Sequence, residues 1–207
     1  LLPDDDLVDL CIGGVLNTMQ LYERSEQIQA DGLVVLAALH SPAPGARMHL
    51  WNDRKLGHVL DALANHPGNG VIALRALDLL SVALKEGPTP GATTARRLSA
   101  ARRKRAPGAG RESFLSIVIK VIERLPAAEH WRLQDARVLS SACHALLKLN
   151  FRDWPLIEDL PYALRPSTDA VLQRARDASI AAGYGVHVWS VEQLRRELQR
   201  HKRTPLR

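Results

Sequence analysis

The chain has 207 residues, of which 46% are hydrophobic, 24% are charged and only 4% are aromatic. This length suits one domain with a substantial core, and the scarcity of aromatic residues beside abundant Leu and Ala favours helices over a sheet. No apolar run reaches the roughly 18 residues of a membrane-spanning helix, and two cysteines do not make a disulfide-built secreted scaffold.

The net charge of +6 is concentrated in two segments. Residues 87–110 contain six basic residues and no acid, and residues 195–207 contain six basic residues and one acid. The rest of the chain has 16 basic and 21 acidic residues, so its body is mildly acidic. A polyanionic partner is therefore expected to bind to these two segments.

Four helices are predicted before residue 87. Three acids at positions 4–6 precede the first, Ser25 caps a second over 26–39, and Asn52 or Asp53 caps a third. Turn residues at 65–70 precede a fourth helix over 71–85. The residues expected to face inward in the first three recur at helical spacing: Leu7, Val8, Leu10, Cys11, Val15, Ile28, Leu33, Val35, Leu36, Leu39, Leu56, Val59, Leu60 and Leu63.

The apolar pattern repeats along the chain. A shift of 44 residues places Leu36 on Leu80, and a further shift of 66 places Leu80 on Leu146. A period near 40 residues is typical of stacked helical repeats. The longer second interval suggests a loop inserted into one repeat.

The segment 87–110 (GPTPGATTARRLSAARRKRAPGAG) has a single large apolar residue, Leu98. A segment of this composition cannot bury enough surface to order itself, so we predict a flexible basic insertion. Its arginines suit phosphate oxygens because the guanidinium group offers paired donors.

After the insertion, a helix is predicted over 112–125, followed by a helical hairpin from Leu133 to Leu164. Asn150 is expected to end the first helix of the hairpin, and Pro166 to stop the second. A further helix begins at Ser167 or Thr168 and ends at Gly183. The inward positions of these helices are Phe114, Ile117, Val118, Val121, Ile122, Val138, Leu139, Ala142, Cys143, Ala145, Leu146, Leu149, Val171, Leu172, Ala175, Ala178 and Ile180.

The end of the chain is predicted to contain a short extended segment and one more helix. Gly185 to Val188 is expected to be extended, and Ser190 with Gln193 to form a capping box for the last helix. Because the first residue is Leu1 rather than Met, we expect the natural chain to begin upstream, with any targeting peptide there.

Three stretches resemble known families. LQDARVLSSACHALLKLNFRDWPLIEDL resembles the helix pair of octotricopeptide and heptatricopeptide repeats, which occur in organellar RNA-binding solenoids beside FAST-type regions and RAP domains. ARDASIAAGYGVHVWSVEQLRREL resembles the end of a RAP domain, and LWNDRKLGHVLDALANHPGNGVIALRALDLLSVAL resembles an armadillo-type unit. The first two resemblances imply an RNA partner, and the third implies a protein partner.

We predict no catalytic site, cofactor, metal site or small-molecule substrate. The eight histidines are scattered, and Cys143 and His144 are adjacent in a helix, so they do not face each other as a nucleophile and base. Neither a phosphate-binding glycine pattern nor a nucleophile elbow is present. Both cysteines lie on expected apolar faces, which predicts buried free thiols.

The predicted fold is all-α, an α-solenoid of stacked antiparallel helix pairs. It divides into N-terminal repeats (1–86), the basic insertion (87–110), C-terminal repeats (111–183) and an extended segment, capped helix and basic tail (184–207).

The preferred functional hypothesis is a non-enzymatic RNA-associated protein, a structural subunit of a mitochondrial ribosome or RNA-processing particle. Its partners are RNA and neighbouring proteins of a large complex, with no membrane. The residues expected to contact RNA phosphates are Arg96, Arg97, Arg102, Arg103, Lys104, Arg105, Arg195, Arg196, Arg200, Lys202 and Arg203. The alternative is a cytoplasmic protein-binding scaffold of armadillo or HEAT type, whose groove receives a basic peptide because the body is acidic.

Overall fold

The computed structural model describes residues 5–40, 51–86, 93–98, 100, 113–149 and 166–203. Within these ranges the regular secondary structure is helical and contains no strand, which confirms the all-α prediction. The main helices are α1 (Asp5–Leu21), α2 (Glu26–His40), α3 (Asp53–Asn65), α4 (Gly70–Glu86), α6 (Phe114–Glu123), α7 (Leu133–Leu147), α9 (Pro166–Ala181) and α10 (Trp189–Arg203). Two short 3₁₀ helices are η2 (Ala128–His130) and η4 (Gly185–His187).

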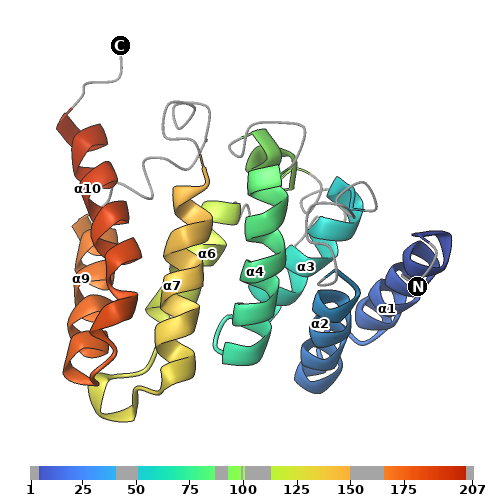
Figure 1. Cartoon of the computed structure of the whole chain (residues 1–207), viewed down its shortest axis with the longest axis horizontal. Coiled ribbons are helices and arrows are strands. Elements are labelled where there is room, and N and C mark those ends of the chain that lie inside the picture. The colour runs from blue at the N-terminus through green and yellow to red at the C-terminus, as the bar shows by residue number, and fades with distance from the viewer. Residues whose placement is uncertain are drawn as a thin grey trace.

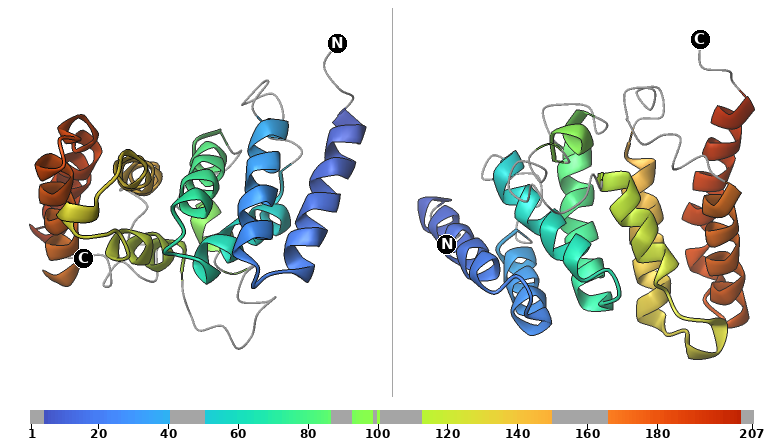
Figure 2. Two further views of the ribbon diagram at one scale, coloured as in Figure 1. Left: turned by 90° about the horizontal axis from the view of Figure 1, so that it is seen from below. Right: turned by 180° about the vertical axis from the view of Figure 1, so that it is seen from behind.

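The helices succeed one another along the long axis of the molecule, from α1 at one end to α9 and α10 at the other (Figure 1, Figure 2). Neighbours in the chain pack as pairs: α1 with α2, α3 with α4, α6 with α7, and α9 with α10. Contacts between successive pairs form two rows. One row runs α1, α3, α6, α9, and the other runs α2, α4, α7, α10.

The three helices that share the apolar pattern in the sequence are neighbours in one row. Leu36 of α2, Leu80 of α4 and Leu146 of α7 are all buried, and α4 contacts both α2 and α7. The equivalent leucines therefore occupy equivalent core positions.

Side-chain caps define where several helices begin. Asn52 accepts a hydrogen bond from the backbone of Lys55 at 3.0 Å, as predicted for α3. Asn69 caps α4 by accepting from the backbone of Ile72 at 3.2 Å, and Ser113 caps α6. Each oxygen satisfies an N–H group that has no partner within its helix.

The end of α9 follows the prediction at Gly183. This glycine has a φ of +83°, and the N–H of Tyr184 donates to the carbonyl of Ser179 at 2.8 Å. Together they form the left-handed turn that commonly closes helices. The start of α9 differs slightly, because the helix begins at Pro166 and not after a cap at Ser167 or Thr168.

The predicted inward positions of α6 and α7 are confirmed, but those of the outer helices are confirmed only in part. In α1 the buried residues are Val8, Ile12, Leu16 and Met19, whereas Leu7, Leu10 and Cys11 are exposed. Val35 and Ile180 are 45% exposed each. A helix at the end of the row is covered on one side only, so apolar residues on its other side stay exposed.

Part of the predicted flexible insertion is ordered. Residues 93–98 are helical, and Leu98 is fully buried with Thr94 and Ala95 on the same face. Arg97 forms an ion pair with Asp53 at 2.7 Å, which ties this turn to the start of α3. One large apolar side chain with small neighbours is thus enough to anchor a single turn. Residues 87–92 and 101–112 lie outside the described residues.

The predicted extended segment and capping box near the C-terminus are wrong. Gly185–His187 forms the 3₁₀ helix η4, and α10 begins at Trp189. Ser190 therefore lies inside the first turn of α10, where its hydroxyl donates to the carbonyl of His187. The second helix of the predicted hairpin, at 153–164, and its connection at Asn150 lie outside the described residues.

None of the helices described is both long and apolar enough to cross a membrane.

Candidate functional site

The predicted RNA-contacting residues that the structure describes belong to two elements, the helical turn 93–98 and α10. Arg96 and Arg196 are exposed, on the turn 93–98 and on α10 respectively. The segment containing Arg102, Arg103, Lys104 and Arg105 lies outside the described residues, as do the side chains of Lys202 and Arg203.

Three of the predicted residues form ion pairs within the chain. Arg97 pairs with Asp53, and Arg200 pairs with Glu197 at 2.6 Å. Arg195 of α10 binds the carboxylate of Asp169 on α9, with its Nε 2.8 Å from Oδ1, and also donates to Gln173. An RNA phosphate that binds these arginines would compete with the carboxylates, and exposed ion pairs of this kind are weak.

A groove of about 480 Å³ lies between α4 and α7. Helix α4 contributes Asp78, Ser81 and Val82, and helix α7 contributes Ser140, Ser141, His144 and Lys148. These two helices are adjacent members of one row near the middle of the array (Figure 1). The groove is open, and every residue that lines it except Val82 has a polar or charged side chain.

Asp78 is the acidic residue of this groove. Its Oδ1 accepts a hydrogen bond from the Ser141 hydroxyl at 3.0 Å, which links the two helices. Although the residue is exposed, burial of the carboxylate raises the pKa of Asp78, and the Ser141 hydrogen bond and the charges of Arg75 and Arg137 oppose this effect.

Basic residues outnumber the acid here. Arg75 and Arg137 are exposed beside Asp78, and Lys148 lines the groove. His144 also lies close enough to Asp78 for a positive charge on its ring to oppose the rise in the pKa of Asp78. Among the residues that line the groove, Lys148 balances the charge of Asp78, and the further positive charge comes from Arg75 and Arg137 beside it.

Ser81 gives the groove a further hydrogen-bonding group. Its Oγ is buried and has no hydrogen-bond partner within the described parts of the chain. A buried hydroxyl without a hydrogen-bond partner destabilises the fold, and a ligand atom that accepts its hydrogen bond removes that cost.

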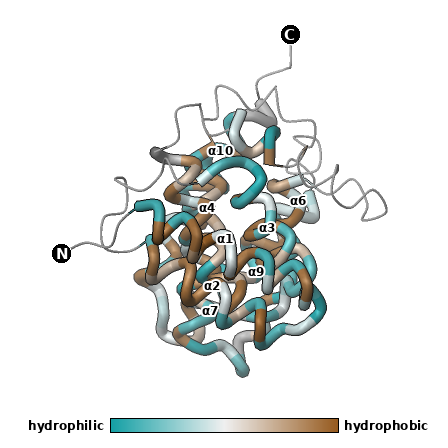
Figure 3. Tube along the Cα trace, turned by 90° about the vertical axis from the view of Figure 1, so that its right-hand side faces the viewer, coloured by the Kyte–Doolittle hydropathy of each residue, from teal (hydrophilic) through white to brown (hydrophobic). Residues whose placement is uncertain are grey.

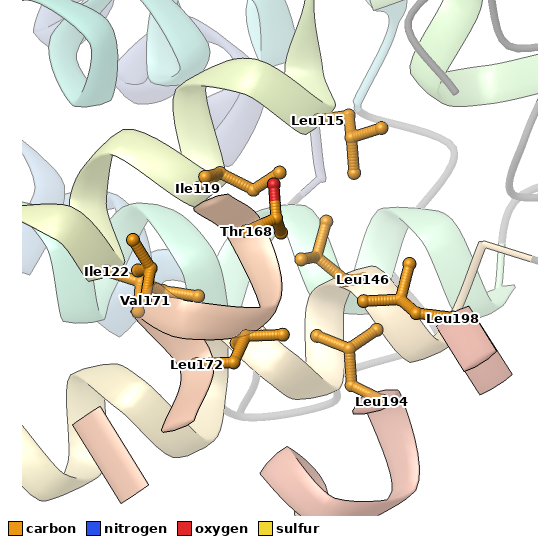
Figure 4. Close-up of a pocket in the computed structure, with 9 residues that line it drawn as sticks. All are labelled: Leu115, Ile119, Ile122, Leu146, Thr168, Val171, Leu172, Leu194 and Leu198. Carbon is orange, nitrogen blue, oxygen red and sulfur yellow. The ribbon is translucent and has the colours of Figure 1, made fainter. Parts of the chain in front are cut away.

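The cavity between α6, α7, α9 and α10 is a different kind of space (Figure 4). It measures about 10 Å³, which is room for about one water molecule. Its walls are aliphatic apart from Thr168: Leu115, Ile119, Ile122, Leu146, Val171, Leu172, Leu194 and Leu198. We interpret it as a small packing defect in the core.

A second open groove, of about 430 Å³, lies beside the C-terminal turn of α6 and is lined by Trp131, Arg174 and Asp177 among others. Its charged groups already have partners. Arg174 donates to the carbonyl of Glu123 at 3.1 Å. A hydrogen bond from Gln173 lowers the pKa of Asp177, with a contribution from Arg176.

The cysteines and histidines do not assemble in the described residues. Cys143 is buried as predicted, and burial raises the pKa of its thiol, whereas the exposure of Cys11 contradicts the prediction. In the same residues, no group of three His, Cys, Asp or Glu side chains is placed to hold a metal ion.

Comparison of the chain with protein-family models, with curated proteins and with solved structures finds no match. The site is therefore interpreted from its own geometry.

The sequence contains one signal for this groove that the motif search missed. Asp78 lies in the middle of a strongly apolar helix, with leucines on both sides at positions 77 and 79. Its outward position follows from helical spacing, but its proximity to Ser141 requires knowing that α4 packs on α7.

Proposed function

We propose that the chain is a non-enzymatic α-solenoid of armadillo or HEAT type that binds an extended acidic segment of a partner protein in the α4–α7 groove. The observation that carries this proposal is the groove itself, on two adjacent helices of one row, with the exposed Arg75 and Arg137 beside its single carboxylate. Pairs of helices stacked in two rows support the solenoid interpretation, because repeat proteins of this kind present one row as a binding surface.

The basic residues account for the preference for an acidic segment. Arg75 and Arg137 bind carboxylates of the partner, and Lys148 adds a third positive charge. Guanidinium groups suit this task because they bind a carboxylate through two parallel hydrogen bonds.

The polar residues of the groove bind the backbone of the segment. Asp78 accepts a backbone N–H, and the Ser81 hydroxyl donates to a backbone carbonyl. Such bonds are independent of the partner's sequence, so the charges provide the selectivity.

A titration with two labelled peptides of equal length tests this proposal. One is rich in Glu and the other is rich in Lys. We expect the Glu-rich peptide to bind more tightly, and the double variant Arg75→Glu/Arg137→Glu to reverse the preference, as measured by fluorescence anisotropy.

The matched control is Arg24→Glu/Arg124→Glu. It makes the same change of charge at two exposed turn residues, after α1 and after α6. The control should keep most of the preference for the Glu-rich peptide. Equal loss in both double variants would show that net charge, rather than the groove, governs binding.

A second candidate function is binding of RNA in a mitochondrial ribonucleoprotein, as the repeat and RAP resemblances imply. It is favoured by the separation of charge in the sequence, with six basic residues and no acid in 87–110. The exposed Arg96 and Arg196 belong to the two basic segments.

RNA binding is best tested by substitution rather than by deletion of 87–110, because the buried Leu98 lies in that segment. The variant Arg102→Ala/Arg103→Ala/Arg105→Ala should weaken RNA binding and reduce its dependence on salt, with unchanged helicity by circular dichroism. Unchanged RNA affinity in this variant would remove the basic insertion from the RNA hypothesis.

A further inference from the structure

The outward face of α1 is apolar and uncovered. Leu7, Leu10 and Leu21 are 54%, 72% and 79% exposed. With Gly14 they are spaced at three, four and seven residues, which places them on one side of the helix. Single exposed leucines are ordinary, but three on one stripe indicate an interaction surface.

Contacts on the other side of α1 fix the direction of this face. Asp9 forms an ion pair with Lys55 of α3, and Ile12 is buried. Met19 lies so close to Gly32 of α2 that a side-chain carbon on Gly32 would be 2.6 Å from its Cγ. Leu7, Leu10 and Leu21 therefore point away from α3, at the free end of the array, which faces the viewer in Figure 3.

The face has two properties of a self-complementary contact. The middle of the stripe carries no charge, since its other members there are Cys11, Asn17 and Thr18, and the one charged residue, Asp6, lies at its N-terminal edge. Gly14 is also midway between Leu7 and Leu21, and a side-chain carbon added there would meet no atom within 4 Å.

We propose that this face binds a second copy of the chain, with the two α1 helices antiparallel across a two-fold axis at Gly14. In that arrangement Leu7 of each copy packs on Leu21 of the other, and Leu10 packs beside Thr18. The two glycines allow the helix backbones to approach closely. A two-fold contact of this kind closes on itself and forms a dimer rather than a fibre.

The contact area predicts a weak dimer. A helix of 17 residues is about 25 Å long, so two such helices bury less than the roughly 1,000 Å² of a stable interface. Tyr22, which is 54% exposed and directly follows Leu21, adds area to the contact. The dimer should therefore form reversibly as the protein concentration rises.

Molar mass measured against concentration tests the proposal on the complete 207-residue chain. By sedimentation equilibrium, the mass should rise from 22.9 kDa towards twice that value, and Leu10→Asp/Leu21→Asp should hold it at 22.9 kDa. The control is Val186→Asp, which changes an 86% exposed residue at the opposite end and should leave the rise intact. A monomer at all concentrations, or equal loss in the control, would overturn the proposal.

A cross-link tests the position of the axis. In a Cys11→Ser background, Gly14→Cys should form a disulfide between two copies on oxidation, because the two residues meet on the axis. Gln20→Cys, exposed on another side of the same helix, should not. Equal cross-linking of both variants would show random collision and contradict the proposed contact.

Discussion

At the α9–α10 end of the array, Arg176 binds Glu192 and Arg195 binds Asp169, so charged side chains connect the last two helices. At the α1 end, leucines face outward instead. Both ends are outer surfaces of the same array. Ion pairs join α9 and α10, and the exposed apolar residues there (Ile180, Val186 and Trp189) lie around the turn between the two helices, whereas α1 exposes leucines along its length.

This difference bears on the proposed dimer. In stacked helical repeats an outer face that is not polar exposes the surface that a neighbouring unit would bury. Along their length, α9 and α10 present a more polar outer face than α1 does. The proposed contact between two α1 helices would cover the leucines of α1.

The largest expected effect is the difference in stability cost between a substitution on the buried side of α1 and one on its exposed side. Ile12→Ala removes a buried side chain and should lower the free energy of unfolding by about 2–5 kcal/mol. Leu10→Ala, on the exposed side, should change it by no more than about 0.5 kcal/mol when the protein is dilute. Urea denaturation followed by circular dichroism measures both values, and similar costs would mean that α1 is rotated about its axis.

The α1–α2 pair also depends on one buried polar residue. The Gln29 side-chain amide donates to the carbonyl of Met19 at 2.7 Å and of Tyr22 at 3.0 Å, at the end of α1. Gln29→Leu leaves both carbonyls without this donor and should cost about 1–3 kcal/mol in thermal or urea unfolding. Gln27→Leu, at an exposed site on the same helix, serves as the control. If both variants lost the same free energy of unfolding, Gln29 would have no special role in joining α1 to α2.

The ion pairs of the opposite end should contribute less. Arg195→Met breaks the contact with Asp169, which is partly exposed, and should cost about 1 kcal/mol or less. High salt should shrink that cost because it screens exposed charges. A loss that is unchanged in 1 M salt would indicate packing of the arginine stem rather than charge pairing.

Ionisation of Asp78 and ionisation of Asp177 should change the stability of the folded chain in opposite directions. The pKa of Asp78 is raised, so its ionisation destabilises the folded chain as pH rises. Asp78→Asn should therefore gain stability relative to wild type between acid and neutral pH. The pKa of Asp177 is lowered, so its ionisation stabilises the folded chain, and Asp177→Asn should lose relative stability over the same rise. Unfolding curves at several pH values test the signs, and the same sign for both would contradict the account.

The sequence predicted the helices well where one face is strictly apolar. In α6 and α7, every predicted inward residue is buried, because these helices have neighbours on several sides. In α1, apolar residues lie on two sides, and spacing alone could not tell the core face from the exposed face.

The candidate groove could not be predicted in the same way. Asp78 and Ser141 are 63 positions apart, and only the packing of α4 on α7 brings them together. The ion pairs of Arg97 and Arg195 likewise depend on which helices are adjacent, so the number of basic residues alone could not predict them.

Hydrogen–deuterium exchange at increasing protein concentration tests the contrast between the ends most directly. The account predicts that amide exchange in Asp5–Leu21 slows as the concentration rises, while exchange in α9 and α10 stays constant. Exchange in α1 that is independent of concentration, or slowing that is confined to α9 and α10, would contradict it.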